Sequence, residues 1–365
     1  MRTALCLVLA AALAACSPSS DTETDARPVP APEEGAVVPA AAPAGEVNLY
    51  TSRHYDTDLA LYEDFTRETG IAVNRIEDSA TSLIQRIESE GEFSPADLLI
   101  TVDAGNLWRA QEAGILSPVD SDTLEARVPA NLRDPDGHWF GLSTRARVII
   151  HNAAAGRPDG LSDYEDLADP ALRGQVCMRS SSNIYNISLL SSIIAHAGAE
   201  AAEDWAEGVV ANFARRPQSN DTGQIEAVAS GECGVSVVNT YYLARHARSD
   251  DPGMRNIVDA VDIVFPNQDG PEGEGRGTHV NISGAGVPVH APNRDNAVLF
   301  LEYLTRPSAQ GYFADGNNEY PVAGDVDGNA AVQALGAFEA DTINLGELGP
   351  HQAEALRIFD RVGWQ

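Results

Sequence analysis

Three times in this chain, an apolar segment of strand length runs into a turn that carries tyrosine and then into a helical pattern. The apolar segments cover residues 47–51, 175–179 and 234–238, and the tyrosines that follow them are Tyr55, Tyr185, Tyr241 and Tyr242. A strand that leads into a helix is the repeating unit of a parallel sheet covered by helices. Ligands bind where such strands end, so the repetition indicates one shared site. A tyrosine pair alone is more often a half-buried structural feature.

The alternation of strands and helices continues along the body of the chain. Residues 71–76 and 96–102 have strand composition, Gly70 suits a helix C-terminus, and Ser79 suits the start of the next helix. Segments 141–152 and 280–289 are predicted to be further strands, and the chain near Ser143 is expected to cross into a second lobe. The pattern predicts an α/β fold with a parallel sheet, followed by helical structure from residue 321 onward.

The first 45 residues do not resemble the body. A short apolar run follows Arg2 and ends in LAAC at residues 13–16, which resembles the lipobox of bacterial lipoproteins. The run is too short to span a bilayer, so we expect residues 1–15 to be a lipoprotein signal peptide and Cys16 to carry the lipid. A plain cleaved signal peptide is the alternative. Residues 16–45 are rich in Ser, Pro, Ala and acidic residues, which is typical of a flexible tether.

The chain is strongly acidic, with 54 Asp and Glu against 24 basic residues, all of them arginine, and a formal net charge of -30. A surface of this charge argues against nucleic acid and against anionic lipid as partners, apart from the lipid anchor. Adaptation to saline surroundings is the alternative explanation of this acidic composition.

Cysteine usage fits export to an oxidising compartment. Cys6 would be lost with the signal peptide and Cys16 lipidated, which leaves Cys177 and Cys233. Two remaining thiols outside the cytoplasm suggest one disulfide. Two buried free thiols are the alternative. Each cysteine lies on or just before a strand that leads to a tyrosine junction, so a bridge would stiffen the lobe behind the site.

Several stretches resemble the periplasmic ferric-iron-binding proteins of ABC importers, in particular their tyrosine-rich branch. These are residues 48–58 (NLYTSRHYDTD), 131–135 (NLRDP), 139–143 (WFGLS), 179–186 (RSSSNIYN) and 239–244 (NTYYLA). The resemblance covers the chain from about Glu46 to its end. It implies a two-lobed periplasmic-binding-protein fold of the Venus flytrap, class II-like kind, with two crossover strands. The expected lobes are residues 46–143 with 276–320, and residues 144–275 with 321–365.

By the same resemblance, Tyr55, Tyr185, Tyr241 and Tyr242 match the phenolate ligands of Fe³⁺ in that family. His54 matches a histidine that coordinates the metal in some members and lies outside the coordination shell in others. Asp103 falls near a carboxylate ligand of other branches, but we do not expect it to bind because the extra tyrosines fill the shell.

The chemistry of the ion agrees with these ligands. A small trivalent ion favours anionic oxygen donors over nitrogen or sulfur, and its charge favours the ionised form of a phenol. Four phenolates around Fe³⁺ leave one negative charge to be offset, for which Arg53, Arg145 and Arg245 are candidates. The serines at 180–182 could cap the following helix or hold a small synergistic anion, and water could also complete the shell.

The function expected from the sequence is capture of ferric iron between the lobes, by a lipid-anchored periplasmic monomer that delivers it to an ABC permease and its ATPase. The alternative is a binding protein of the same fold for another solute, such as a polyamine or a small anion. An enzyme is not expected, because no G-x-S-x-G or H-E-x-x-H motif occurs.

Overall fold

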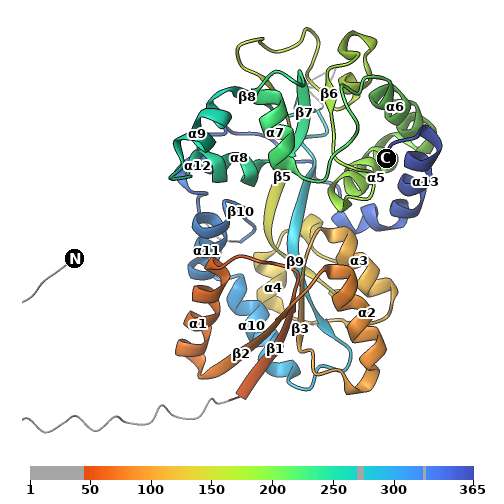
Figure 1. The fold of residues 1–365 in the computed structure, drawn as a ribbon. Helices are drawn as coiled ribbons and strands as arrows, with labels where there is room; N and C mark the ends of the chain where they lie inside the picture. The colour runs from red at the N-terminus through yellow and green to blue at the C-terminus, as the bar shows by residue number, and fades with distance from the viewer. Residues whose placement is uncertain (1–44, 269–274, 324–325) are drawn as a thin grey trace, which may run out of the picture. The chain divides into compact units, whose positions relative to one another are not determined.

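The computed structural model describes residues 45–268, 275–323 and 326–365 (Figure 1). The expected signal peptide, Cys16 and all but the last residue of the expected tether lie outside the described residues. Among the helices of the described part, none is long and apolar enough to cross a membrane.

Helices and strands alternate as predicted, and they gather into two groups that Figure 1 shows below and above the centre of the view. The elements of the lower group, the first lobe, are β1 (Gly45–Thr51), α1 (Thr57–Thr69), β2 (Ile71–Glu77), α2 (Ala80–Glu90), β3 (Leu98–Val102), α3 (Ala104–Glu112), β4 (Leu116–Ser117), α4 (Asp122–Arg127), α10 (Arg294–Leu304), α11 (Pro307–Asn317) and β10 (Tyr320–Pro321). The elements of the upper group, the second lobe, are β6 (Val176–Cys177), α5 (Ile184–Ala197), α6 (Ala199–Ala211), α7 (Asp221–Ala229), β7 (Val235–Asn239), α8 (Thr240–Ala247), α9 (Pro252–Asp259), β8 (Val261–Val264), α12 (Ala330–Gln333) and α13 (Gln352–Val362). Short 3-10 turns are η1 (Gly91–Phe93), η2 (Ala130–Leu132), η3 (Glu165–Ala168), η4 (Pro170–Leu172) and η5 (Leu345–His351).

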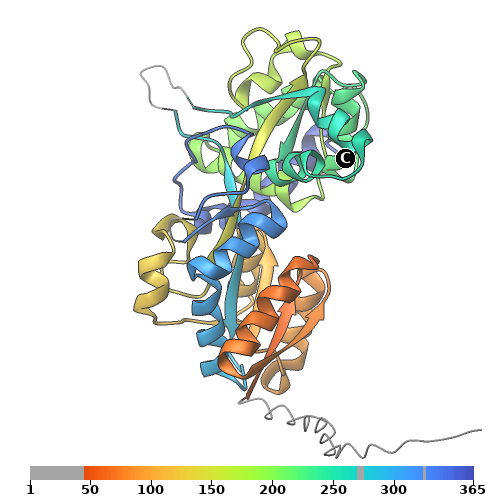
Figure 2. The same ribbon diagram turned by 90° about the vertical axis from the view of Figure 1, so that its left-hand side faces the viewer.

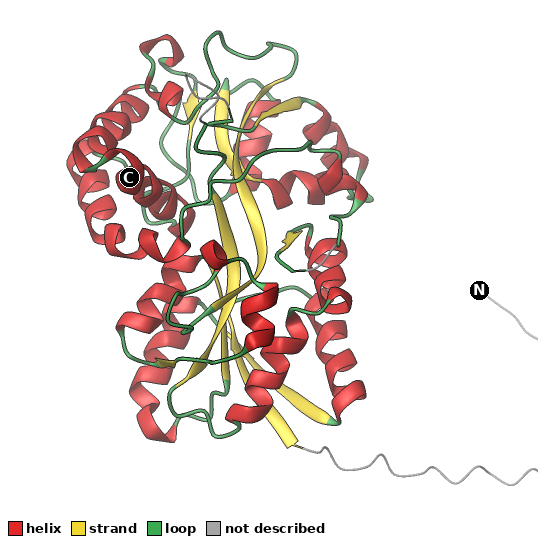
Figure 3. Ribbon diagram, turned by 180° about the vertical axis from the view of Figure 1, so that it is seen from behind, coloured by secondary structure: helices red, strands yellow, loops and turns green. Residues whose placement is uncertain are grey.

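Two long strands, β5 (Phe140–Asn152) and β9 (Val280–Pro288), join the groups. Seen from behind in Figure 3, both strands run from one group of helices into the other. Phe140 of β5 lies in the first hydrophobic core, whereas Val148 of the same strand lies in a core of the second lobe. The strand therefore passes from one core to the other between Phe140 and Val148, and Ser143 lies on this part of it.

The sheet is mixed rather than parallel throughout. Its strand order is β2-β1-β3-β9-β5-β7-β6, and β1 pairs in parallel with β2 and β3, as β6 does with β7. The crossover strands differ, because β9 runs antiparallel to both β3 and β5. The expected parallel arrangement holds for these strand pairs of the βα units and is wrong for the strands that pass between the lobes.

The predicted helix ends are confirmed where the sequence offered a physical signal. Gly70 ends α1 in the left-handed conformation at φ 74°, which costs glycine little because it has no Cβ. The Ser79 side chain caps α2 by accepting a hydrogen bond from the Ser82 amide.

The chain beyond residue 321 differs from the expected helical region of the second lobe. It carries α12 and α13, but η5 between them packs Leu345 and Leu348 into the first core. Ile358 and Phe359 of α13 then return to the second core. Figure 2 shows this blue C-terminal segment beside both groups of elements. The C-terminal chain therefore adds crossings between the lobes beyond those of β5 and β9.

Candidate functional site

Each predicted junction forms, and each places its tyrosine where a helix begins. Tyr55 lies in the turn between β1 and α1, Tyr185 is the second residue of α5, and Tyr241 and Tyr242 open α8 directly after β7. Apolar β-branched residues make β7 a fully buried strand, so its end is fixed by core packing.

The expected serine cap of α5 is wrong. The side chain of Asn183 caps this helix by accepting a hydrogen bond from the Tyr185 amide at 3.1 Å. The hydroxyls of Ser180 and Ser182 lie 3.0 Å apart and bond to each other in the preceding turn. Asn has a carbonyl oxygen at the right reach for an N-cap, and it is as strong a capping residue as serine.

The phenols of the second lobe lie in contact. The hydroxyl oxygens of Tyr185 and Tyr241 are 3.4 Å apart, and the rings of Tyr241 and Tyr242 stack with centroids 4.3 Å apart. Tyr55, in the first lobe, is close enough to this group to interact with it electrostatically. A phenolate at Tyr55 would raise the pKa of Tyr241, and a phenolate at Tyr185 would raise the pKa of Tyr55. The structure thus brings all four predicted tyrosines together.

These phenols are costly to ionise without a cation. Burial raises the pKa of Tyr55, Tyr185 and Tyr241 above the ordinary value of a phenol. Mutual repulsion between the phenolates raises the pKa of Tyr241 further. In the absence of a bound cation, these three groups therefore stay protonated at neutral pH.

Arg145 is a cation that acts on phenols of both lobes. It lies on β5, its residue exposure is 2%, and its guanidinium carbon is 5.5 Å from the centroid of the Tyr185 ring. Its charge lowers the pKa of Tyr185 and Tyr55 against the effect of burial. Within the described part of the chain, neither Nη1 nor Nη2 of Arg145 has a hydrogen-bond partner. A buried guanidinium without partners is expensive, so this site is set up to receive negative charge.

The other two candidate arginines differ from Arg145. Arg53 is buried beside the Tyr55 ring, at 4.8 Å, but its Nε bonds Asp58 at 2.8 Å and its Nη1 bonds Glu319 at 3.0 Å. Its charge is therefore already matched by carboxylates. Arg245 is exposed and lies over the Tyr242 ring at 4.7 Å, where water screens its charge.

A buried network beneath Tyr185 escaped the sequence analysis. Asp221 accepts hydrogen bonds from Arg147 and Arg179 at 3.0 Å each, and both guanidinium groups lie within 6 Å of the Tyr185 ring centroid, at 5.8 and 5.2 Å. Asn186 bonds Arg147 at 2.9 Å and the Arg179 carbonyl at 2.8 Å. Arg147 and Asp221 are far from the junction in sequence and share no spacing pattern with it, so only the positions of Arg179 and Asn186 on either side of Tyr185 could have drawn attention to the network.

Asp103 lies between the lobes. It is fully buried, it caps α3 through the Gly105 amide at 3.0 Å, and it accepts a hydrogen bond from the Ser188 hydroxyl of α5 at 2.6 Å. Burial raises the pKa of Asp103, while Arg145 acts in the opposite direction. Its carboxylate is thus engaged in holding two helices.

His54 points away from the network. Its side chain is 60% exposed, and its Nδ1 lies 3.4 Å from a carboxylate oxygen of Glu77 on β2. Within residues 45–268, 275–323 and 326–365, no group of three or more His, Cys, Asp or Glu side chains is arranged to hold a metal ion. Phenol oxygens are the anionic donors that this site offers.

The disulfide expected from cysteine usage is present. Cys177 and Cys233 are bridged, with their Cα atoms 5.9 Å apart. Cys177 lies on β6, which pairs with β7. The bridge therefore fastens the strand that leads to Tyr185 to the turn before the strand that leads to Tyr241.

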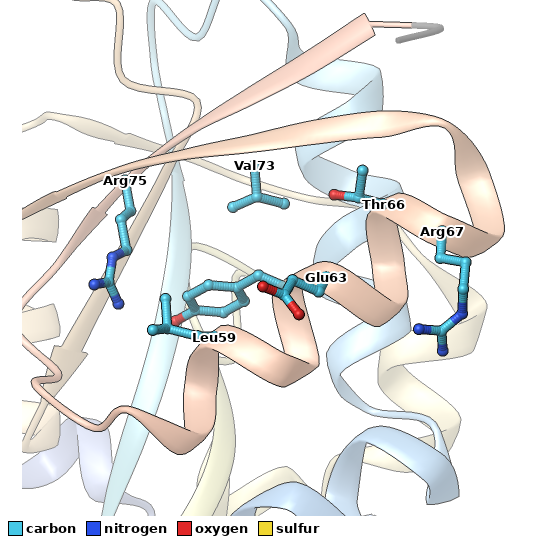
Figure 4. Close-up of a pocket in the computed structure, with 7 residues that line it drawn as sticks. Leu59, Glu63, Thr66, Arg67, Val73 and Arg75 are labelled. Carbon is cyan, nitrogen blue, oxygen red and sulfur yellow. The ribbon is translucent and has the colours of Figure 1, made fainter. Parts of the chain in front are cut away.

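A surface cavity lies outside the group of four phenols. Figure 4 shows this cavity, of about 430 Å³, in the first lobe, between α1 and the edge strand β2, lined by Leu59, Tyr62, Glu63, Thr66, Arg67, Val73 and Arg75. Its walls mix apolar groups with both signs of charge, and it contains none of the four phenols of the site.

A two-lobed α/β fold with convergent phenols from both lobes is the architecture of a solute-binding protein. Residues 93–336 match the family model of the bacterial extracellular solute-binding proteins, and the chain belongs to this family. Iron uptake protein A1 of Synechocystis sp. is 52% identical over 320 residues, which cover 88% of this chain and 88% of that protein. The resemblance to periplasmic ferric-iron-binding proteins of ABC importers is thereby confirmed.

Solved structures support the same relationship. The Trichodesmium protein IdiA or FutA, in complex with iron and citrate ligands, is 53% identical, covers 88% of this chain and 100% of its own, and superposes with a TM-score of 0.84. The ferric iron-binding protein A of Mannheimia haemolytica, in an open conformation, is 40% identical over 88% of this chain and 99% of its own, with a TM-score of 0.80. The predicted fold class, two-lobed with crossover strands, is confirmed.

Proposed function

We propose that this protein captures ferric iron between its lobes and delivers it to an ABC permease. The observation that carries the proposal is the convergence of Tyr55, Tyr185, Tyr241 and Tyr242 beside the buried Arg145, whose terminal nitrogens have no hydrogen-bond partner among the described residues. Ferric iron prefers anionic oxygen ligands, and four phenolates would leave one negative charge for the guanidinium to offset. The iron uptake and ferric-binding functions of the relatives support the same cargo.

The four tyrosines are the proposed ligands, and Arg145 is the proposed counter-charge. Arg245 would add a weaker, screened charge, and Arg53 would position the Tyr55 turn. His54 would have to turn away from Glu77 to coordinate, so water or a small anion is the simpler occupant of any remaining position. The Trichodesmium relative is in complex with both iron and citrate, which supports a small anion at such a site.

Capture rather than catalysis is the proposed role. Iron that is bound first by the phenols of one lobe would recruit those of the other and close the cleft, because a ligand shifts an equilibrium by its differential affinity for the two states. The open conformation of the Mannheimia haemolytica relative supports a cleft that opens. A permease and its ATPase would then receive the closed form.

The proposed location is the periplasm, with the chain anchored to a membrane by a lipid. The family name supports an extracellular position. Lipidation of Cys16, a tether over residues 16–45 and a monomeric state complete the proposal. Mass spectrometry of the mature protein would test the lipid on Cys16.

The test of the function is a visible spectrum of the purified protein, recorded before and after chelated ferric iron is added and again after a reductant. We expect a broad phenolate-to-iron band that disappears on reduction. Replacing Tyr241 and Tyr242 by Phe removes only the oxygens, so the fold should persist while the band is lost. Tyr312→Phe is the matched control, because that phenol lies on α11 and bonds Asp64 rather than joining the site. A flat wild-type spectrum with the fold intact would favour the polyamine or anion alternative.

A further inference from the structure

We propose that two hydrogen bonds between the lobes, one from each tyrosine-bearing helix of the second lobe, hold the cleft closed and set how fast its cargo leaves. The bonds are Ser188 to Asp103 and Arg248 to the C-terminus of α11. The prediction about the release rate depends on the proposed function, whereas the prediction about closure of the cleft does not.

The first bond belongs to α5, the helix that begins with Tyr185. Ser188 lies one turn beyond this phenol, is fully buried, and donates to Asp103 of the first lobe at 2.6 Å. Its neighbours Ile187 and Leu189 pack in the second core, whereas Asp103 follows β3 of the first. A hydroxyl that donates to a carboxylate away from water makes one of the stronger side-chain hydrogen bonds. The bond therefore joins the Tyr185 helix directly to the first lobe.

The second bond belongs to α8, the helix that begins with Tyr241 and Tyr242. Arg248 directly follows this helix, and its Nη1 donates to the Asp315 carbonyl and, at 2.8 Å, to the Asn318 side-chain oxygen. Asn318 ends α11 in the left-handed conformation at φ 59°. A cation at a helix C-terminus is favourable because the last carbonyls lack partners within the helix.

The helix that receives Arg248 is also tied to the Tyr55 junction. Asn317 of α11 accepts a hydrogen bond from the Thr57 hydroxyl, at 2.6 Å, in the first turn of α1. Arg248 thus connects α8, which carries two phenols, to α11. In turn, α11 is bonded to α1, the helix that follows Tyr55 in the first lobe. Any opening that moves α5 and α8 away from α3 and α11 breaks both bonds and separates the phenols at the same time.

The chain offers a matched control for the first bond. Ser191 lies on the same helix, is equally buried, and its hydroxyl has no hydrogen-bond partner within the described residues. We expect Ser188→Ala to speed iron release to an excess of competing chelator by about tenfold or more, since a hydrogen bond to a charged group is lost. Ser191→Ala should release iron at nearly the wild-type rate. The absorption band should keep its position in both variants, because all four phenols remain.

The second bond has its own control. Arg255 of α9 is also exposed, but it donates to the Ser249 carbonyl within the second lobe. Arg248→Ala should speed release by about two- to fivefold, as expected for an exposed polar contact, and Arg255→Ala should leave the rate unchanged. Equal rates for Ser188→Ala and Ser191→Ala, or for Arg248→Ala and Arg255→Ala, would overturn the proposal.

A measurement without metal separates this inference from the proposed function. If the wild-type protein shows no iron band, small-angle X-ray scattering of the metal-free variants becomes decisive. Ser188→Ala and Arg248→Ala should then increase the radius of gyration relative to their controls. Identical scattering from all four variants would refute the closure even when no iron binds.

Discussion

At the residue scale, the surroundings of Arg145 are the strongest indication of the charge that the site binds. Its guanidinium is buried against the Tyr185 ring, and among the described residues its two terminal nitrogens have no partner. Nearby phenolates would supply the missing negative charge. The effect of a charge depends steeply on how much water screens it, so the buried Arg145 and the exposed Arg245 should contribute unequally.

Substitution of these two arginines tests that inequality. We expect Arg145→Gln to weaken ferric iron binding by about tenfold or more, since a buried charge interaction is lost, and Arg245→Gln to weaken it by less than about fivefold. Competition titration against a chelator of known affinity measures both. Equal losses would show that Arg145 does not act as the counter-charge.

His279 provides a second test at the residue scale. Burial, together with repulsion from Arg147, Arg145, Arg276 and His196, lowers the pKa of His279 to about 3. In the unfolded chain a histidine takes up its proton near pH 6.5. Between these values only the unfolded state is protonated, so acidification from about pH 6.5 towards 3 lowers the free energy of unfolding.

Replacing His279 by Gln should remove this contribution. Relative to the variant, the wild type should lose about 1.4 kcal/mol of unfolding free energy for each pH unit below about 6.5. Urea unfolding of both proteins at several pH values between 7 and 4.5 measures the difference. Parallel pH profiles would mean that His279 does not stay neutral in the folded protein.

At the scale of elements, the site depends on strands that end beside one another and on what fastens them. The pairing of β6 with β7 and the bridge between Cys177 and Cys233 fix the approaches to Tyr185 and Tyr241. Both cysteines are buried. Both belong to the core cluster against which Tyr242 packs, so the disulfide supports the site from within that core.

Removal of the disulfide should lower the free energy of unfolding without abolishing iron binding. The Cys177→Ser and Cys233→Ser double variant lacks a link between residues 56 apart in sequence, and the unfolded chain gains about 4 kcal/mol of conformational entropy at room temperature. We expect a lower free energy of unfolding in denaturant, with the iron band still present under native conditions. Loss of the band in a variant that remains folded would assign the disulfide a direct role in the site.

The elements most accessible to prediction were those with a local signal. The β7 strand, the α1 and α2 ends and the tyrosine junctions follow from runs of apolar residues, glycine and serine. The sequence does not distinguish Asn183 from the three serines before it as the cap of α5. The packing of η5 into the first core is not predictable either, because a 3-10 turn has no extended periodicity. The pairing of Asp221 with Arg147 and Arg179, and of Glu319 with Arg53, depends on contacts distant in sequence, which a single sequence does not encode as a pattern.

At the scale of the whole molecule, we expect the binding of iron to be coupled to the release of protons. Burial raises the pKa of Tyr55, Tyr185 and Tyr241, so these phenols are protonated in the metal-free protein at neutral pH. As proposed ligands of Fe³⁺, each would have to lose its proton to bind the ion. Lower pH therefore opposes binding, and higher pH favours it.

The number of protons released gives a direct test. We expect one proton for each coordinating phenol, and a ferric affinity that falls by about tenfold per released proton for each pH unit of acidification. Calorimetry in buffers of different ionisation enthalpy measures the release, and Tyr241→Phe should reduce it by one. Binding without proton release would be incompatible with neutral phenols as the starting state.

The last residues of the chain are attached to the loop that precedes Tyr185. The indole of Trp364 donates to the Arg179 carbonyl at 2.9 Å, and the Gln365 carbonyl accepts a hydrogen bond from the Ser181 amide at 3.3 Å. An affinity tag fused after Gln365 would emerge beside this loop and disturb it, whereas one placed ahead of Gly45 would emerge at the outer end of β1 (Figure 1). The same proximity would make a fluorophore attached after Gln365 a reporter of iron at the proposed ligand Tyr185, so the C-terminus would serve as the attachment point of an optical iron sensor.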